Sequence, residues 1–330
     1  MKPFTTHQEQ IEILKNRGLI ISDEPSACKI LDAENYYNLI NGYKNSFITT
    51  DTNGLEKFLP GTTFEEIHQL FLFDRALRTL LLPYFLKFET TIKSRLSYRF
   101  SQAYQKEKSY LDMKNYSKNT LHTKSILILI PTLYKVIGNE MEKSNSISHY
   151  LTQYGHVPLW VLVNFLTFGN IHHIYRCLQP NVKTSIGKDF GNSYKADYQV
   201  EHAQFSSELM EATLKTLNYF RNVCAHEERL FSFKLHKPSK SSALAKLINI
   251  PASKLNKGNV FTAVAFLKLV TPKELYEEMI SNLSALFFEY SIHFTLVTFK
   301  KLMFQMGFEA DWHDLLTSKI ETFEIIKTKV

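Results

Sequence analysis

The chain contains little cysteine, glycine or proline for its length. Of its 330 residues, 3 are cysteine, 11 are glycine and 10 are proline. The cysteines, at positions 28, 177 and 224, are far apart, which excludes a disulfide framework and a paired-cysteine zinc site. Few residues break regular structure, and apolar residues recur at three- and four-residue steps. The sequence therefore predicts an all-α fold.

The sequence also lacks long apolar runs and metal-binding motifs. Its most apolar stretches, 70–88 and 125–137, are broken by charges or too short to cross a membrane, and the first residues have no signal-peptide core. With so few cysteines, we expect a cytoplasmic protein without a membrane partner. There is no HExxH motif, no carboxylate cluster for two metals and no glycine-rich phosphate loop. We therefore expect no metal and no cofactor, and neither an NTPase nor a metal-dependent nuclease.

Acidic residues are absent from one long segment. The net charge of the chain is +7, and residues 229–273 contain no Asp or Glu but nine basic residues: Arg229, Lys234, Lys237, Lys240, Lys246, Lys254, Lys257, Lys268 and Lys273. Such a segment favours contact with RNA, whose phosphates attract clustered lysines. A solvated lysine-rich loop is the alternative.

Apolar periodicity and capping residues predict most of the helices. Thr63 and Glu66 form a capping-box pattern, so a long helix is expected to begin there. Its expected buried stripe consists of Leu77, Leu81, Tyr84, Phe88, Ile92 and Leu96. The other expected helices span His7–Arg17, Glu24–Ile40, Lys118–Val136, Pro158–Leu178, Ser206–Leu230, Val260–Leu269 and Pro272–Gln305. Gly18 is expected to end the first of them. A turn-rich stretch over 49–63 predicts an N-terminal helical extension, 1–60, and a helical core with C-terminal helices, 61–330.

Two further groups of residues have open roles. The aromatic cluster Tyr36, Tyr37, Tyr43 and Phe47 is typical of a core, although such rings also stack on bases. Arg95 and Arg99 are one turn apart in the long helix and are candidate RNA contacts.

Arg221, Asn222 and His226 are the candidate catalytic residues. In a helix over 206–230, the side chains of these three residues and Arg229 fall on one side, within roughly 140°. Histidine transfers protons near neutral pH, and arginine is a permanent bidentate partner for phosphate. We therefore expect His226 to act as acid or base, Arg221 to stabilise the transition state and Asn222 to orient one of them.

This pattern predicts RNA cleavage without a metal, completed by a second chain. The reaction needs a base for the 2′-OH and an acid for the leaving 5′-oxygen, and one histidine does not readily serve as both in one turnover. Two copies that meet at a two-fold axis supply two histidines, so we expect a homodimer. Glu89 is expected either to orient Arg221 or His226, or to pair with Lys93 within its own helix.

The Arg–His spacing is not specific by itself. It arises by chance in roughly a quarter of chains this long. The alternative is an arginine bonded to a carboxylate and a histidine satisfied inside a helix interface. The predicted RNA-binding residues around the motif are Arg229, Lys234, Lys237, Lys240, Lys246, Lys254, Lys257, Arg95 and Arg99.

Six blocks of sequence, in order, resemble the bacterial abortive-infection (Abi) proteins of the AbiD/AbiF type. They are Gln8–Leu19, Tyr36–Phe47, Pro60–Ile67, Phe73–Arg78, Pro158–Gly169 and Arg221–Leu230. The resemblance implies a HEPN-like helical bundle, often dimeric, that cleaves RNA through an Arg-x4–6-His motif matched by Arg221, Asn222 and His226. It also implies phage defence and restraint by a small non-coding RNA, as in some toxin–antitoxin systems.

One part of the resemblance departs from the pattern. Glu227 and Glu228 follow the histidine where His or Asn and a small residue are expected, and Phe231 replaces a Trp. Two carboxylates beside the motif repel phosphate if they face the cleft.

Two other functions remain open. The first is a non-catalytic RNA-binding module that holds a structured RNA. The second is a toxin silenced by modification of a tyrosine four residues after the histidine; Leu230 stands there and argues against it.

Overall fold

Helices make up nearly all the regular structure of the computed structural model, which describes residues 3–51 and 54–318. The structure is 69% helical, so the predicted all-α fold is confirmed. Within the described ranges, the one sheet pairs β1 (Ile48–Thr50) with β2 (Glu56–Phe58) in antiparallel fashion, with Ile48 opposite Phe58.

The chain folds into two compact units, each built from separate stretches of sequence. Unit 1 contains residues up to Leu81, Val223–Phe233 and Met279–Glu309; unit 2 contains Leu82–Asn222, Lys234–Glu278 and the residues from Ala310 onward. The unit boundaries fall inside three helices, α3 (Phe64–Ala103), α9 (Ser207–Ala225) and α13 (Lys273–Ser291). The predicted division into 1–60 and 61–330 stays a prediction.

Unit 1 begins with two short helices whose ends follow the sequence signals. Thr6 caps α1 (His7–Asn16), and Gly18 has a φ of +91° just after it, as expected for a glycine that ends a helix. The second helix, α2 (Glu24–Glu34), does not continue to Ile40 as predicted, because Asn35 has a φ of +66°. The remaining elements are a π-turn (Tyr37–Asn41), a 3-10 turn (Lys44–Ser46) and α14 (Leu296–Met306).

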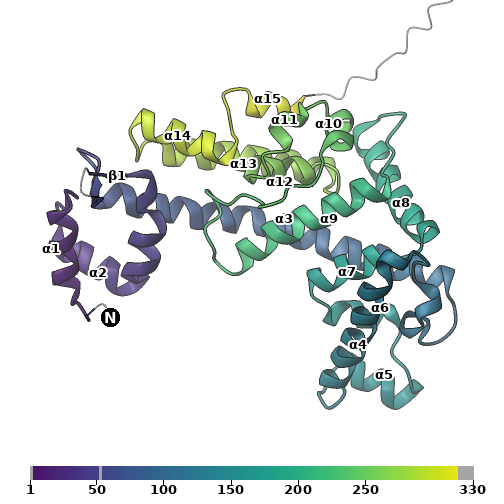
Figure 1. The fold of residues 1–330 in the computed structure, drawn as a ribbon. Coiled ribbons are helices and arrows are strands. Elements are labelled where there is room, and N and C mark those ends of the chain that lie inside the picture. Colours follow the sequence, from purple (N-terminus) through teal and green to yellow (C-terminus); the bar gives the residue numbers. More distant parts are fainter. Residues whose placement is uncertain (1–2, 52–53, 319–330) are drawn as a thin grey trace, which may run out of the picture. The chain divides into compact units, whose positions relative to one another are not determined.

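The long helix α3 begins where the capping box predicts (Figure 1). The Glu66 amide donates to Thr63 Oγ1 at 3.1 Å, and the Thr63 amide donates to the Glu66 carboxylate at 3.4 Å, which confirms the prediction. Pro83 lies inside the helix without ending it.

The buried stripe of α3 follows the predicted periodicity with one exception. Leu77, Leu81, Phe88, Ile92 and Leu96 are fully buried, whereas Tyr84 is only half-buried and Phe85 takes its place in the core. Of the aromatic cluster before α3, Tyr43 and Phe47 are buried and Tyr37 is exposed.

Unit 2 contains most of the remaining helices, coloured teal to green in Figure 1 except α15, which is yellow. They are α4 (Thr123–Glu140), α5 (Ser146–Tyr154), α6 (Leu159–Leu162), α7 (Phe168–Cys177), α8 (Pro180–Tyr198), α10 (Ser242–Ile248), α11 (Ala252–Leu255), α12 (Val260–Leu267) and α15 (Trp312–Thr317), with 3-10 turns at Ser109–Leu111, Met113–Asn115, Thr120–His122 and Val163–Phe165.

Three further helix predictions are corrected by the structure. The range 158–178 divides into α6 and α7, because Thr167 caps a new helix. The range 272–305 divides into α13 and α14, because the hydroxyl of Thr295 accepts from the Thr298 amide at 3.2 Å. The motif helix ends at Ala225 and not at Leu230.

Helix α8 was not predicted, because its two internal glycines lower helix propensity. A Cβ at Gly187 would lie 2.2 Å from the carbonyl oxygen of Phe205, and one at Gly191 would lie 2.6 Å from that of Ala203. The glycines therefore let the 203–205 backbone pack directly against α8.

Candidate functional site

Arg221 lies near the end of α9, next to a buried carboxylate of α3. Its Nε atom is 2.9 Å from Oε2 of Glu89, and Oε1 of Glu89 is 2.8 Å from Nζ of Lys93. Glu89 is only 5% exposed. The contacts of Glu89 with Arg221 and with Lys93, which were expected as alternatives, therefore occur together, since this carboxylate lies between the guanidinium and the ammonium group.

The contact between Arg221 and Glu89 is mainly electrostatic. The two atoms are at ion-pair distance, but neither has a partner in hydrogen-bond geometry among the described residues. The Arg221 guanidinium also donates from Nη1 to Oδ1 of Asn222 at 3.3 Å. Two sides of the guanidinium are thus occupied, and its orientation is restricted.

His226 is exposed and follows the last residue of α9. Within the described parts of the chain, no hydrogen bond or ion pair involves its ring. The alternative interpretation of the motif placed the arginine on a carboxylate and the histidine inside a helix interface. The structure shows the first of these features and not the second.

The helix ends at this point because the chain forms a C-terminal cap. The Glu228 amide donates to the Val223 carbonyl at 3.0 Å, and the Glu227 amide donates to the Cys224 carbonyl at 3.4 Å. Glu227 has a φ of +56°, the left-handed conformation usually taken by glycine in this motif. The first of the two unexpected glutamates thus occupies the residue position that terminates α9.

A buried aspartate of α3 accepts the backbone that follows the cap. Both oxygens of Asp74 accept from the Leu230 amide, at 3.2 and 3.1 Å, and Oδ1 accepts from the Phe231 amide at 2.6 Å. Asp74 is fully buried. A continued helix would direct these two amides to carbonyls of its own preceding turn, so their bonds to Asp74 account for the corrected helix end.

Asp74 is itself held by two further side chains in unit 1. It accepts from the Tyr43 hydroxyl at 2.8 Å and from Nη1 of Arg78 at 2.6 Å. Nη1 of Arg78 also donates to the Glu228 carbonyl at 3.3 Å. Burial raises the pKa of Asp74, while the Arg78 cation and these donors oppose that rise.

Sequence reasoning gave Asp74 and Arg78 no role. The sequence did contain one signal: an aspartate and an arginine lie four residues apart within an apolar stripe. Burying such charges costs free energy unless they are paired, so a buried ion pair is expected there.

Arg229 and Phe231 are held within unit 1. Because α9 ends at Ala225, Arg229 is not on the helical strip on which the sequence placed it; its Nη1 donates to the Gly42 carbonyl. Phe231, which stands where the resemblance expects Trp, stacks on Tyr43 with ring centroids 5.7 Å apart. The phenyl ring thus fills a buried position.

Arg95 and Arg99 join α3 to α8. The Arg95 guanidinium lies 4.0 Å from the centre of the Phe190 ring and donates to the Ser193 hydroxyl at 2.7 Å. Arg99 forms a two-pronged pair with Asp189, with Nε 2.7 Å from Oδ2. RNA contact by these two arginines stays a prediction.

The acid-free segment contains lysines in different environments. Lys234, Lys237, Lys240, Lys246 and Lys257 are exposed. Lys254 lies 2.7 Å from a carboxylate oxygen of Asp311. Lys268 is buried and donates to the Leu316 carbonyl at 2.8 Å, and burial lowers its pKa to about 8. RNA binding by the exposed lysines and Lys254 stays a prediction.

The described residues contain neither a cluster of metal-ligating side chains nor a helix that could span a membrane. Over 3–51 and 54–318, no three His, Cys, Asp or Glu side chains are arranged to hold a metal ion. In the same ranges, no helix has the length and apolar character needed to cross a membrane.

These features define an all-α protein in which an Arg-Asn-x3-His sequence ends a helix and its arginine pairs with a buried glutamate. The family model for the Abi-like proteins matches residues 29–232, so the chain belongs to that family. The matched range includes Glu89, Arg221 and His226. No curated protein and no solved structure matches the chain. Family membership indicates a role in abortive-infection defence against phage.

Proposed function

We propose that the protein is a metal-independent endoribonuclease of the HEPN type that acts in abortive infection. The observation that carries the proposal is the pairing of Arg221 with buried Glu89, at the end of a helix followed by an exposed histidine. An arginine held in this way keeps a fixed orientation, which favours recognition of a planar pair of phosphate oxygens.

In the proposed reaction, the 2′-oxygen of the RNA attacks the adjacent phosphorus. A bond forms between the 2′-oxygen and phosphorus, and the bond from phosphorus to the 5′-oxygen breaks. The 2′-OH proton goes to a neutral imidazole, and the leaving 5′-oxygen takes a proton from an imidazolium. The products are a 2′,3′-cyclic phosphate and a 5′-hydroxyl, and Arg221 stabilises the charge on the pentacoordinate phosphorus.

One copy of the chain supplies one motif histidine, so we propose that a homodimer completes the site. His226 of each copy then serves as base or acid. Asn222, bonded to Arg221, restricts that guanidinium. We also propose that a small non-coding RNA, bound by the basic segment, restrains the enzyme until infection.

Cleavage of RNA in EDTA tests this function. The wild-type protein should cleave single-stranded RNA to 2′,3′-cyclic phosphate ends and leave DNA intact. Arg221→Ala and His226→Ala should both be inactive, whereas His236→Ala, which removes another exposed histidine, should retain activity. An excess of the His226→Ala protein should inhibit the wild-type protein if the active species is a dimer.

Three results would contradict parts of the proposal. Cleavage that persists in the His226→Ala protein would refute the role of this histidine. Cleavage that EDTA abolishes would refute the metal-independent mechanism. Tight, salt-dependent RNA binding without turnover would favour the non-catalytic RNA-binding module.

A further inference from the structure

Three hollows adjoin one another in unit 2, around the segment that follows α3. Their volumes are about 510, 260 and 760 Å³. The first and second share Ser101, Gln105 and Trp160. The second and third share the run from Tyr104 to Ser109. Because their linings overlap, we name the three hollows together the 94–160 groove.

One end of the 94–160 groove presents two large aromatic rings. Tyr98 is 61% exposed and Trp160 is 56% exposed, and both line the first hollow. The other side chains there are small or polar: Ser94, Ser97, Ser101, Gln102 and Gln105. Rings of this size usually gain stability by burial, so a ligand with a flat apolar face would complete their environment.

The middle and far parts of the groove carry positive charge. Lys106 and Lys108 are exposed, and no ion pair joins either of them to a carboxylate of the described residues. Two acidic side chains also line this region, and one lies close to a histidine and the other to a lysine. Glu107 lies 3.7 Å from Nδ1 of His156, and Asp112 lies 2.6 Å from Nζ of Lys114.

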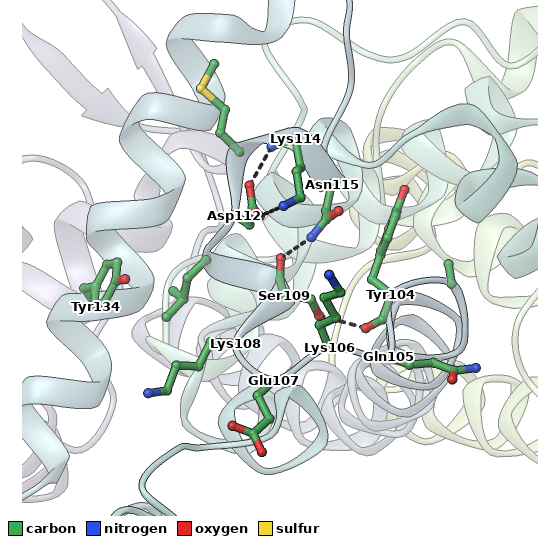
Figure 2. Close-up of a pocket in the computed structure, with 13 residues that line it drawn as sticks. Tyr104, Gln105, Lys106, Glu107, Lys108, Ser109, Asp112, Lys114, Asn115 and Tyr134 are labelled. Carbon is green, nitrogen blue, oxygen red and sulfur yellow. Dashed lines mark hydrogen bonds and ion pairs between the residues drawn. The ribbon is translucent and has the colours of Figure 1, made fainter.

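Figure 2 shows the third hollow between two tyrosines. Tyr134 of α4 stands on one side and Tyr104 on the other, beside Asn115, while Lys108 extends along the lower edge. Aromatic rings therefore line the far hollow as well as the first, and in the far hollow lysines lie among them.

We propose that the 94–160 groove binds single-stranded RNA. Bases stack on Trp160 and Tyr98, serine and glutamine side chains contact base edges, and Lys106 and Lys108 contact phosphates. Stacking rings with intervening cations are the general solution for binding an unpaired strand, because every base has a flat π-face and every linkage a negative charge. A protein partner would gain little from a groove lined by so many hydroxyl and amide groups.

The inference rests on the proposed function only for the choice of RNA, since the groove lies outside the catalytic motif. The groove would bind RNA at residues other than those proposed to cleave it.

Tryptophan fluorescence tests the groove directly, because the chain has only two tryptophans, Trp160 and Trp312. Trp312→Phe leaves Trp160 as the only tryptophan emitter, and His226→Ala in the same protein prevents cleavage during the measurement. Titration with an unstructured oligonucleotide of about ten nucleotides should quench the emission. The same oligonucleotide in a perfect duplex should leave it unchanged.

Affinity measured by polarisation of a labelled oligonucleotide provides the second arm. In the His226→Ala protein, Trp160→Ala should weaken binding about tenfold or more, the expected effect of losing one stacked base. Trp160→Phe keeps an aromatic ring and should bind within about threefold of the parent. Phe288→Ala, which removes an aromatic ring that is 78% exposed in α13, should leave affinity unchanged.

Two outcomes would overturn the proposal that the 94–160 groove binds RNA. One is saturable RNA binding without any change in Trp160 emission. The other is equal affinity in the Trp160→Ala protein and its parent, with far-ultraviolet circular dichroism showing that both are folded. Neither outcome bears on cleavage by Arg221 and His226. Conversely, quenching and loss of affinity in a protein that never cleaves RNA would support the groove and refute the proposed function.

Discussion

Replacement of Glu89 by Gln tests how Arg221 is held. Glu89 is buried, and its two oxygens face Lys93 and Arg221 at 2.8 and 2.9 Å. Glutamine has nearly the same shape, so the substitution removes the charge without opening a cavity. The two cations then lie close together without the carboxylate that separates them, and they repel each other.

The expected loss of stability lies between the values for buried and exposed pairs. Removing one partner of a fully buried pair costs about 3 to 5 kcal/mol, and an exposed pair contributes about 0 to 1 kcal/mol. The side chains of Lys93 and Arg221 are 15% and 23% exposed, so water screens them partly. We expect Glu89→Gln to lower the free energy of unfolding by about 2 kcal/mol.

A matched control separates the two partners of Glu89. Lys93→Gln leaves the pair with Arg221 intact and should cost about 1 kcal/mol or less. The double-mutant cycle of Glu89→Gln with Arg221→Gln should give a coupling of about 1 to 2 kcal/mol. Urea unfolding followed by circular dichroism measures all of these quantities.

The substitution of Glu89 should also affect activity. Glu89→Gln should lower the cleavage rate of the folded enzyme because the guanidinium loses its fixed orientation, whereas Lys93→Gln should change it little. A coupling energy near zero would refute the electrostatic account of the Arg221–Glu89 contact. An unchanged rate in folded Glu89→Gln protein would refute the positioning role.

Two further predictions concern stability. Glu227→Gly should raise the free energy of unfolding by about 0.5 to 1 kcal/mol, because glycine adopts the positive φ of this cap without strain. Glu228→Gly is the control: this residue has no positive φ, so the substitution should lower the free energy of unfolding. Equal urea midpoints for the two variants would contradict this assignment. Burial, with Arg176 nearby, lowers the pKa of His172 to about 4 from an ordinary value of 6.5. The folded state therefore favours the neutral ring, and the stability this provides is fully present above pH 6.5 and is lost as the pH falls from 6.5 toward 4, by about 2 kcal/mol at pH 5. Unfolding at pH 7 and pH 5 should differ less in His172→Gln than in the wild type, and an identical difference would show that His172 does not titrate in this way.

Local signals allowed much of the helical architecture to be predicted. The capping box of Thr63 and Glu66 placed the start of α3, and Gly18 marked the end of α1, because these signals act within one helical turn. Apolar periodicity gave most of the buried stripe of α3, since period alone decides which residues share a face.

Other elements were missed because distant backbone contacts decide them. Gly187 and Gly191 lower the helix propensity of α8, yet they are what allows the 203–205 backbone to pack against it. No local pattern around these glycines indicates that contact.

The candidate site divides in the same way. The sequence by itself singled out Arg221, Asn222 and His226 as candidates, because their side-chain chemistry and spacing are local properties. It offered two roles for Glu89: orienting Arg221 or His226, or pairing with Lys93. Only the tertiary structure decided that Glu89 pairs with both Lys93 and Arg221, and that α9 ends before Arg229. The physical reason is that buried charges must find partners wherever the fold brings them. Asp74 thus binds amides more than 150 residues away in the chain, at Leu230 and Phe231, and fixes the backbone after His226.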